Sequence, residues 1–151
     1  MDVPQKDTLQ VKTNLNDLNL VLTWFETFNR AEIPRSVWLQ CQSALAEAFT
    51  NAVRHAHQGM DPETPIEIWV LVEPGCLQFA VWDWGKAFDL GAALAKLPQR
   101  VDARSGGGRG LQIMHKVADR LDYSPTPDGR NRLLLVKYFQ PASPANDAST
   151  P

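Results

Sequence analysis

Two spacings of hydrophobic residues divide the chain into expected helices and strands. Apolar residues recur every three or four positions in three stretches that predict helices, at residues 15–30, 34–57 and 110–121. Apolar and polar residues alternate in stretches that predict strands, at residues 66–73, 77–83, 121–124 and 132–139, with a further short strand around Leu9 and Val11. A short apolar segment, residues 90–97, predicts one or two helical turns.

Turn and cap residues fix how these elements connect. Thr13 or Asn14 is suited to cap the first helix, and Pro34 suits the first position of the second. Pro74-Gly75 fits the centre of a type II turn, so the two strands on either side should form an antiparallel hairpin. The order of elements predicts an α/β two-layer sandwich, with one mostly antiparallel sheet covered on one face by helices.

Length and composition favour one domain. At 151 residues, with 44% hydrophobic and 21% charged residues, the chain has ordinary globular values. We expect a flexible N-terminus at residues 1–8, a domain at residues 9–140 and a disordered tail at residues 141–151, which contain no aromatic residue.

Charge and cysteine content argue against several classes of partner. A net charge of −2 gives no overall field that would attract a polyanion, so nucleic acid is not an expected partner. No apolar run approaches the ~18 residues that a membrane helix needs. Cys41 and Cys76 have apolar neighbours typical of buried free thiols, and we expect a cytoplasmic protein.

The second predicted helix carries a polar pair on one face. Glu47 and Asn51 stand one turn apart, so that a carboxylate and an amide share a site. Any surface helix can carry such a pair in contact with water, which makes it a weak signal alone. The opposite arc of the helix is apolar and should face the core, through Cys41, Leu45, Ala48, Phe49, Ala52, Val53 and Ala56.

An acidic residue and a glycine follow the predicted hairpin. Asp83 ends the second strand, where its carboxylate can accept a hydrogen bond from an exocyclic amine such as that of adenine. Gly85 would let a flat ring approach the backbone. An ordinary Asp/Gly turn is the alternative, and in isolation it is the more common one.

A glycine-rich stretch precedes the third predicted helix. Backbone N–H groups at the start of a helix, together with its dipole, form a ready site for phosphate oxygens, and arginines add charge. A flexible linker is the alternative, although a pure linker rarely runs directly into an amphipathic helix. The candidate residues are Arg104, Gly106, Gly107, Gly108, Arg109, Gly110 and Leu111.

In this order, the three motifs resemble the N-box and the two glycine boxes of the GHKL ATPase superfamily, which has the Bergerat ATP-binding fold. Three motifs at suitable intervals are much more specific than one. The finer pattern is most similar to the anti-sigma factor serine/threonine kinases. It comprises Asn51-Ala52-x-x-His55-Ala56, Asp83-x-Gly85-x-x-Phe88-Asp89 and Gly110-Leu111-x-Ile113-Met114. The resemblance covers roughly residues 9–138.

The resemblance implies an ATP site with Mg²⁺. Asn51 would ligate Mg²⁺ and Asp83 would recognise adenine, while Gly108 and Gly110 would hold phosphates under a lid formed by residues 98–107. One protein amide is sufficient for Mg²⁺, which keeps waters and phosphate oxygens as its other ligands. The other implied contacts of the nucleotide are Gly85, Arg104, Gly106, Gly107, Arg109 and Leu111.

The resemblance also implies a catalytic role for Glu47, which would orient the serine hydroxyl of a protein substrate and accept its proton late. One position departs from the superfamily: Ala87 stands where the first glycine box often has its second glycine, so lid closure or nucleotide affinity should differ. His55 matches the motif, and we expect a structural histidine that packs or caps at the helix end.

The implied partners are an anti-anti-sigma protein of the STAS type, which is phosphorylated, and a sigma factor, which is sequestered. A homodimer is also implied, with the N-terminal strand and first helix as its interface. The alternatives are a non-catalytic switch controlled by nucleotide and, less favoured, the detached ATP-binding domain of a histidine kinase. The last needs a phosphoacceptor histidine, whereas His55, His57 and His115 all lie within the ATP-binding region.

Overall fold

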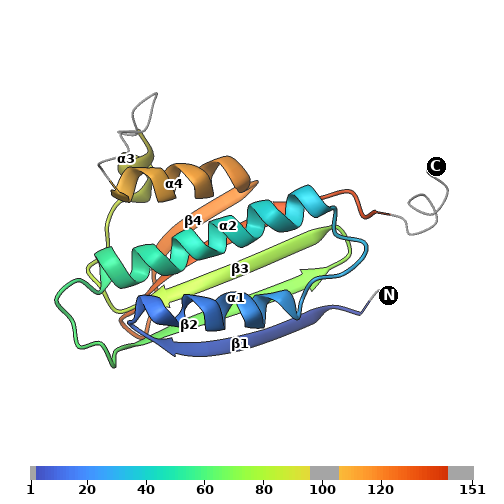
Figure 1. The fold of residues 1–151 in the computed structure, drawn as a ribbon. Coiled ribbons are helices and arrows are strands. Elements are labelled where there is room, and N and C mark those ends of the chain that lie inside the picture. Colours follow the sequence, from blue (N-terminus) through green and yellow to red (C-terminus); the bar gives the residue numbers. More distant parts are fainter. Residues whose placement is uncertain (1–2, 96–105, 143–151) are drawn as a thin grey trace.

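The protein is described by a computed structural model over residues 3–95 and 106–142. Five strands form a single sheet in the order β1-β2-β3-β5-β4, and every neighbouring pair is antiparallel (Figure 1). The strands are β1 (Gln5–Lys12), β2 (Pro65–Glu73), β3 (Cys76–Asp83), β4 (Arg120–Pro125) and β5 (Asn131–Tyr138).

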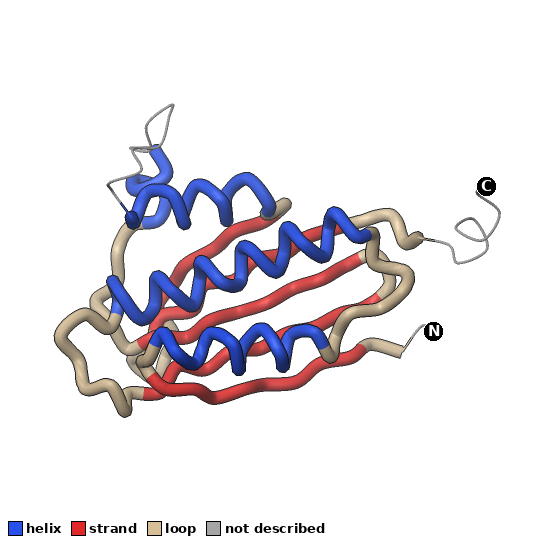
Figure 2. The backbone as a smooth tube through the Cα atoms, viewed as in Figure 1, coloured by secondary structure: helices blue, strands red, loops and turns tan. Residues whose placement is uncertain are grey.

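The helices lie in one layer over one face of the sheet (Figure 2). They are η1 (Leu15–Asp17), α1 (Leu18–Glu26), α2 (Arg35–Asn51), η2 (Ala52–Ala56), α3 (Leu90–Ala95) and α4 (Gly106–Val117). This arrangement confirms the predicted α/β two-layer sandwich. In the described part of the chain, no helix combines the length and the apolar character that crossing a membrane requires.

The hairpin of β2 and β3 forms as predicted. Glu73 and Cys76 are paired across it, which leaves Pro74 and Gly75 as the two residues of the turn. Gly75 has a φ of 76°, a left-handed conformation that glycine adopts without steric cost. Alternation along β2 also holds, since Ile66, Ile68, Val70 and Val72 face the core.

The first helix is shorter than the predicted residues 15–30. The Asn14 side chain accepts a hydrogen bond from the Asn16 N–H at 2.9 Å and starts a 3₁₀ turn, η1, before α1 begins. At the other end, the Thr27 hydroxyl donates to the Trp24 carbonyl at 2.6 Å, and the chain leaves the helix after Glu26. Local hydrogen bonds to the backbone therefore end the helix before its apolar pattern does.

The second predicted helix is present along its whole length, but its last turn is wider. α2 ends at Asn51 and continues directly as the π-helix η2, in which the His57 N–H donates to the Ala52 carbonyl at 2.9 Å. Short π-helical turns inside longer helices occur frequently at functional sites. This turn lies directly after the polar pair of α2.

The third helix begins and ends earlier than the predicted residues 110–121. α4 begins at Gly106, so Gly106 and Gly107, the last two residues of the expected lid, lie in the helix. At the other end, Asp119 N–H donates to the Val136 carbonyl at 2.9 Å, and Leu121 pairs with Leu135 in the sheet. Of the predicted lid, residues 98–105 lie outside the described part.

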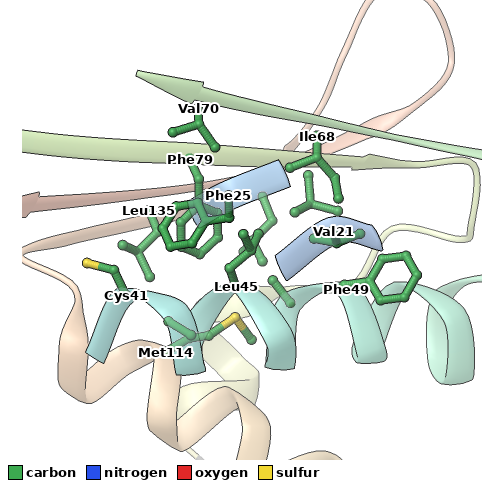
Figure 3. Close-up of a cluster of buried hydrophobic side chains, with 14 of the residues drawn as sticks. Val21, Phe25, Cys41, Leu45, Phe49, Ile68, Val70, Phe79, Met114 and Leu135 are labelled. Atoms are coloured by element: carbon green, nitrogen blue, oxygen red, sulfur yellow. The ribbon is translucent and has the colours of Figure 1, made fainter. Parts of the chain in front are cut away.

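The core lies between the sheet and the helix layer. Figure 3 shows side chains from α1 and α2 meeting side chains of the sheet, with Met114 of α4 beside them. Phe25 and Trp38 stack at 4.3 Å between ring centroids. Cys41 and Cys76 are buried free thiols, as predicted, and burial raises the pKa of Cys41 to about 12.

Candidate functional site

The polar pair of α2 lies against the start of α4. Gly110 approaches so closely that an added Cβ would stand 2.7 Å from Glu47 Oε2 and 3.4 Å from both terminal atoms of the Asn51 amide. Glu47 and Asn51 are both partly buried, and Cys41, Leu45, Ala48, Phe49 and Ala52 on the opposite arc are fully buried. The structure thus brings the first and third sequence motifs together.

Asp83 is buried at the end of β3, with 5% of its surface exposed, and its carboxylate accepts three hydrogen bonds. Oδ1 accepts from the Gly85 N–H at 2.8 Å and from Asn131 Nδ2 at 3.0 Å, and Oδ2 accepts from the Tyr123 hydroxyl at 3.3 Å. A carboxylate offers about four acceptor positions. Oδ2 therefore retains room to accept one more donor.

Two residues that hold Asp83 were not predicted from the sequence. Asn131 is 3% exposed and pairs directly with Asp83 across β3 and β5. Its amide also donates to the Gly85 carbonyl at 2.8 Å. Burial, and then the negative charge of Asp83, raise the pKa of Tyr123, so its hydroxyl stays protonated as a donor. A motif does not reveal strand register. Knowing how β3 pairs with β5 would have identified Asn131 as the neighbour of Asp83.

Gly85 is needed for a different contact from the one expected. An added Cβ would collide with the Ala56 carbonyl oxygen and stand 2.8 Å from its carbon. The space left by the missing side chain is thus filled by the backbone of η2. The glycine joins the second motif to the end of the first.

A cavity of about 270 Å³ lies between these motifs, near the lower end of small-molecule pockets at ~300–1,000 Å³. Its walls are largely apolar, with Asn51 and Asp83 among the few polar groups. The lining residues are Ala48, Asn51, Ala52, His55, Ala56, Val81, Asp83, Lys86, Phe88, Leu111, Met114, Tyr123 and Leu133.

Two aromatic rings stand at the rim of the cavity. Phe88 is 49% exposed and stacks on Tyr123 with ring centroids 4.4 Å apart and an angle of 25° between the planes. Both rings line the cavity. A flat aromatic ligand entering here would meet a π surface beside the Asp83 carboxylate.

The buried histidine of the helix end is His57 rather than His55. His55 is exposed and lines the cavity, so of the predicted structural roles, packing or capping at the helix end, packing is wrong. His57 is 2% exposed, accepts the Trp84 N–H at Nε2 at 2.8 Å, and contacts the Thr13 hydroxyl at Nδ1 at 2.8 Å. The family motif points to His55, whereas the wide turn of η2 buries His57.

The glycine-rich motif is divided. Gly106, Gly107 and Gly108 form the first turn of α4, whose N–H groups have no partner within the helix. Gly110 faces Glu47, Leu111 lines the cavity and Arg109 is exposed. Arg104 lies outside the described residues.

Among residues 3–95 and 106–142, no three His, Cys, Asp or Glu side chains form a cluster that could hold a metal ion. A magnesium ion at this site would therefore depend on few protein ligands. Asn51 offers a hard amide oxygen beside the side-chain-free Gly110. That donor set fits Mg²⁺ bound mainly through phosphate oxygens and waters.

Comparison with known proteins finds similar sequences and similar folds. The model of the histidine kinase-like ATPase domain matches residues 11–137. The serine-protein kinase RsbW of Bacillus pumilus (strain SAFR-032) is 34% identical over 85 residues, 52% of this chain and 52% of the relative. The chain thus aligns with about half the length of that curated relative.

Two solved structures share the fold. The SiaB–SiaC complex from Pseudomonas aeruginosa matches with a TM-score of 0.50 and 13% identity, covering 87% of this chain and 89% of the other. The mycobacterial sensor histidine kinase MprB matches with a TM-score of 0.50 and 16% identity, covering 90% and 100%. The resemblance to GHKL ATPases, with similarity to a serine-protein kinase of the anti-sigma branch, is confirmed. The chain belongs to the histidine kinase-like ATPase domain family.

Proposed function

We propose that the protein binds ATP with Mg²⁺ in the cavity and transfers the γ-phosphoryl group to a serine of a partner protein. The observation that carries this proposal is that one cavity is lined by both Asn51 and Asp83, with Glu47 beside Asn51 and Gly110 close to both. Membership of the ATPase domain family implies that the chain uses a nucleotide. Similarity to a serine-protein kinase supports serine as the acceptor.

Asp83 recognises adenine in this proposal. The exocyclic amine donates to Oδ2, which has acceptor capacity left, while Oδ1 stays fixed by Gly85 and Asn131. The buried position of the carboxylate excludes water that would compete for this bond. Phe88 and Tyr123 supply an aromatic surface for the base.

The phosphates lie at the start of α4, where free N–H groups and the helix dipole favour negative charge. Gly106, Gly107, Gly108 and Gly110 supply backbone without side chains, and Arg109 supplies positive charge. Arg104 belongs to the same motif and is proposed for the same role. Mg²⁺ held by the Asn51 oxygen would neutralise charge that develops on the phosphates.

Glu47 orients the attacking hydroxyl in the proposed transfer. The serine oxygen attacks the γ-phosphorus, the bond to the bridging oxygen of ADP breaks, and Glu47 takes up the hydroxyl proton. Phosphoryl transfer has a loose transition state, so little base strength is needed until the bond has largely formed. Positioning by Gly110 matters more than basicity here.

The proposed substrate is an anti-anti-sigma protein of the STAS type, and the proposed second partner is a sigma factor that the protein sequesters in the cytoplasm. Support comes from the three motifs and from the similarity to a serine-protein kinase over 85 residues. Alternation between the two partners would follow the phosphorylation of the first.

We also propose a homodimer through β1 and the first helix. β1 is an edge strand, with β2 as its only neighbour in the described sheet. Leu20 on α1 is 52% exposed and Leu15 on η1 is 37% exposed. Exposed apolar side chains beside an open strand edge are suited to association. Light scattering of wild type and Leu20→Glu tests it: loss of the dimer in the variant is expected, and a monomeric wild type would rule it out.

A non-catalytic switch is the second candidate. Ala87 stands where the family pattern often has a glycine, and it is exposed on the loop after Asp83. This difference would change lid closure or nucleotide affinity and leave Glu47 as it is. In that case nucleotide would control which partner is held, and no phosphate would move.

The deciding experiment is a pull-down from the native cytoplasm with ADP or ATP, followed by mapping of phosphorylated sites on captured proteins. Wild type and Glu47→Gln are compared, because the variant keeps the size of the side chain and removes its charge. We expect both to bind ATP and only wild type to phosphorylate a serine. Equal phosphorylation by both would refute the role of Glu47, and ATP binding without any labelled protein would favour the switch.

A further inference from the structure

His57 joins three separate segments through a chain of hydrogen bonds. The Thr13 hydroxyl donates to the Thr64 carbonyl at 2.7 Å, so its oxygen is the acceptor for His57 Nδ1–H at 2.8 Å. The Trp84 N–H in turn donates to Nε2 at 2.8 Å. The network therefore requires the neutral imidazole with its proton on Nδ1.

The segment that His57 holds is the one that carries the adenine contact. Three backbone groups around Trp84 have defined partners: Trp84 N–H binds His57, Gly85 N–H binds the Asp83 carboxylate, and the Gly85 carbonyl accepts from Asn131. Gly85 also lies against the Ala56 backbone, one residue before His57. Two contacts thus attach this loop to the end of the helix that carries Glu47 and Asn51.

We propose that His57 is a positioning residue of the nucleotide site, which as the neutral Nδ1–H tautomer holds the Asp83–Gly85 segment at a fixed distance from the Asn51 end. This inference rests on the proposed ATP site. His57 is not among the residues that line the cavity. It affects ATP affinity by keeping Asp83, at the adenine end of the site, at a fixed distance from Asn51, at the metal end.

Protonation of His57 would break this link, because an Nε2–H group would face the Trp84 N–H as a second donor. Burial lowers the pKa of His57 below its usual value, and the nearby Asp83 carboxylate opposes this. The groups that contact His57 from the other segments, Thr13, Thr64 and Trp84, are uncharged there. Among the described residues, Asp83 is the charged group whose field acts on the ring.

The test compares wild type with His57→Gln, His57→Asn and the control His115→Gln. Glutamine can place an oxygen near the position of Nε2 and does not titrate, whereas asparagine reaches only the position of Nδ1 and leaves the Trp84 N–H without its acceptor. His115 is exposed on α4 and gives the same chemical change elsewhere. The readouts are ATP dissociation constants from pH 5.5 to 8 by calorimetry, and thermal melting of each variant.

At pH 8 we expect His57→Gln and His115→Gln to bind ATP within about threefold of wild type, and His57→Asn to bind roughly tenfold more weakly, the typical effect of a lost buried hydrogen bond. At the acid end of this range, as the pH approaches the lowered pKa of His57, the affinity of wild type should fall relative to that of His57→Gln. The ratio of the two constants cancels the titration of the nucleotide itself.

Several results would overturn the inference. One is an equal ATP dissociation constant for His57→Asn and wild type at pH 8. Another is the same dependence of ATP affinity on pH for wild type and His57→Gln. A ¹⁵N spectrum of wild type that shows Nε2 protonated at pH 8 would do so even if the asparagine variant failed to fold. A wild type that binds no ATP would instead refute the proposed function, so the two failures are distinguishable.

Discussion

The variant Gly110→Ala should displace the Glu47 carboxylate while leaving the fold stable. It therefore tests how far the position of Glu47 limits the reaction. The added methyl would stand 2.7 Å from Glu47 Oε2, whereas ordinary contacts lie at 3.4–4 Å. Glu47 Oε2 must therefore move by about 0.7 Å, which is possible because it is the end of a flexible side chain. The two Asn51 contacts, at 3.4 Å, are already ordinary and can remain.

The effect on stability should be small or favourable. Gly110 lies within α4 and its φ is not positive, so alanine fits the backbone and gains up to about 1 kcal/mol in helix propensity. For a chain of this size that corresponds to a rise in melting temperature of roughly 2–4 °C. Transfer activity should instead fall about 10- to 100-fold, because a displacement approaching 1 Å misaligns the carboxylate with the hydroxyl.

Single-turnover transfer from labelled ATP to the captured serine substrate measures the rate, and calorimetry and thermal melting measure ATP affinity and stability. The matched control is Gly91→Ala in α3, where the added Cβ stands at an ordinary 3.4 Å from Asp89 Oδ1. We expect the control to transfer phosphate at the wild-type rate. A Gly110→Ala protein with wild-type transfer would show that the position of Glu47 does not limit the reaction, and a large fall in melting temperature would show that α2 and α4 cannot accommodate the shift.

Three further predictions address other parts of the site. Gly85→Ala should lower the free energy of unfolding, measured in urea, by about 2–3 kcal/mol. The added methyl group would meet the Ala56 backbone, which cannot move aside as a side chain can. Unchanged stability would contradict the close approach of Gly85 to Ala56. Asp83→Asn should weaken ATP binding roughly tenfold or more in calorimetry while the protein stays folded. The reason is that an amide hydrogen would replace the oxygen acceptor that faces the adenine amine. Undiminished affinity would exclude Asp83 as the adenine contact. Because the pKa of His57 is lowered in the fold, the unfolded chain takes up its proton first, so this contribution to stability is complete above about pH 6.5 and is lost as the pH falls below it. Unfolding free energies measured from pH 7.5 to 5 should therefore fall more steeply for wild type than for His57→Gln, and equal slopes would contradict the lowered pKa.

The central hairpin of the sheet and the placement of Glu47, Asn51 and Asp83 could be predicted because the signals are local. Alternation along residues 66–83 and the Pro74-Gly75 turn specify the hairpin that ends at Asp83. Helical spacing of Glu47 and Asn51 puts both on one face of α2. These features depend on residues close in sequence, and the structure has them where expected.

The supporting contacts depend on tertiary register and were not predicted. Asn131 meets Asp83 only because β5 pairs with β3 in one particular register, and Tyr123 reaches it from the next strand. The burial of His57 in place of His55 follows from the wide turn of η2. A local hydrogen bond of Thr27 ends α1, whereas α4 ends where Asp119 and Leu121 join β5 in the sheet.

The π-helical turn also sets the rotational phase between α2 and the segment that begins at His57. Ala52 and His57 are both buried although they are five residues apart, positions that stand about 140° apart around an α-helix. The extra residue accommodated in the turn brings both to the same side. Deletion of one residue within η2 would let the turn relax to α-helix, in which His57 would follow Ala52 by four positions, about 40° around the axis, and stay on the same side. A continuous α-helix would therefore need its buried side chain four residues after Ala52, rather than five, to reach the segment that follows Asp83.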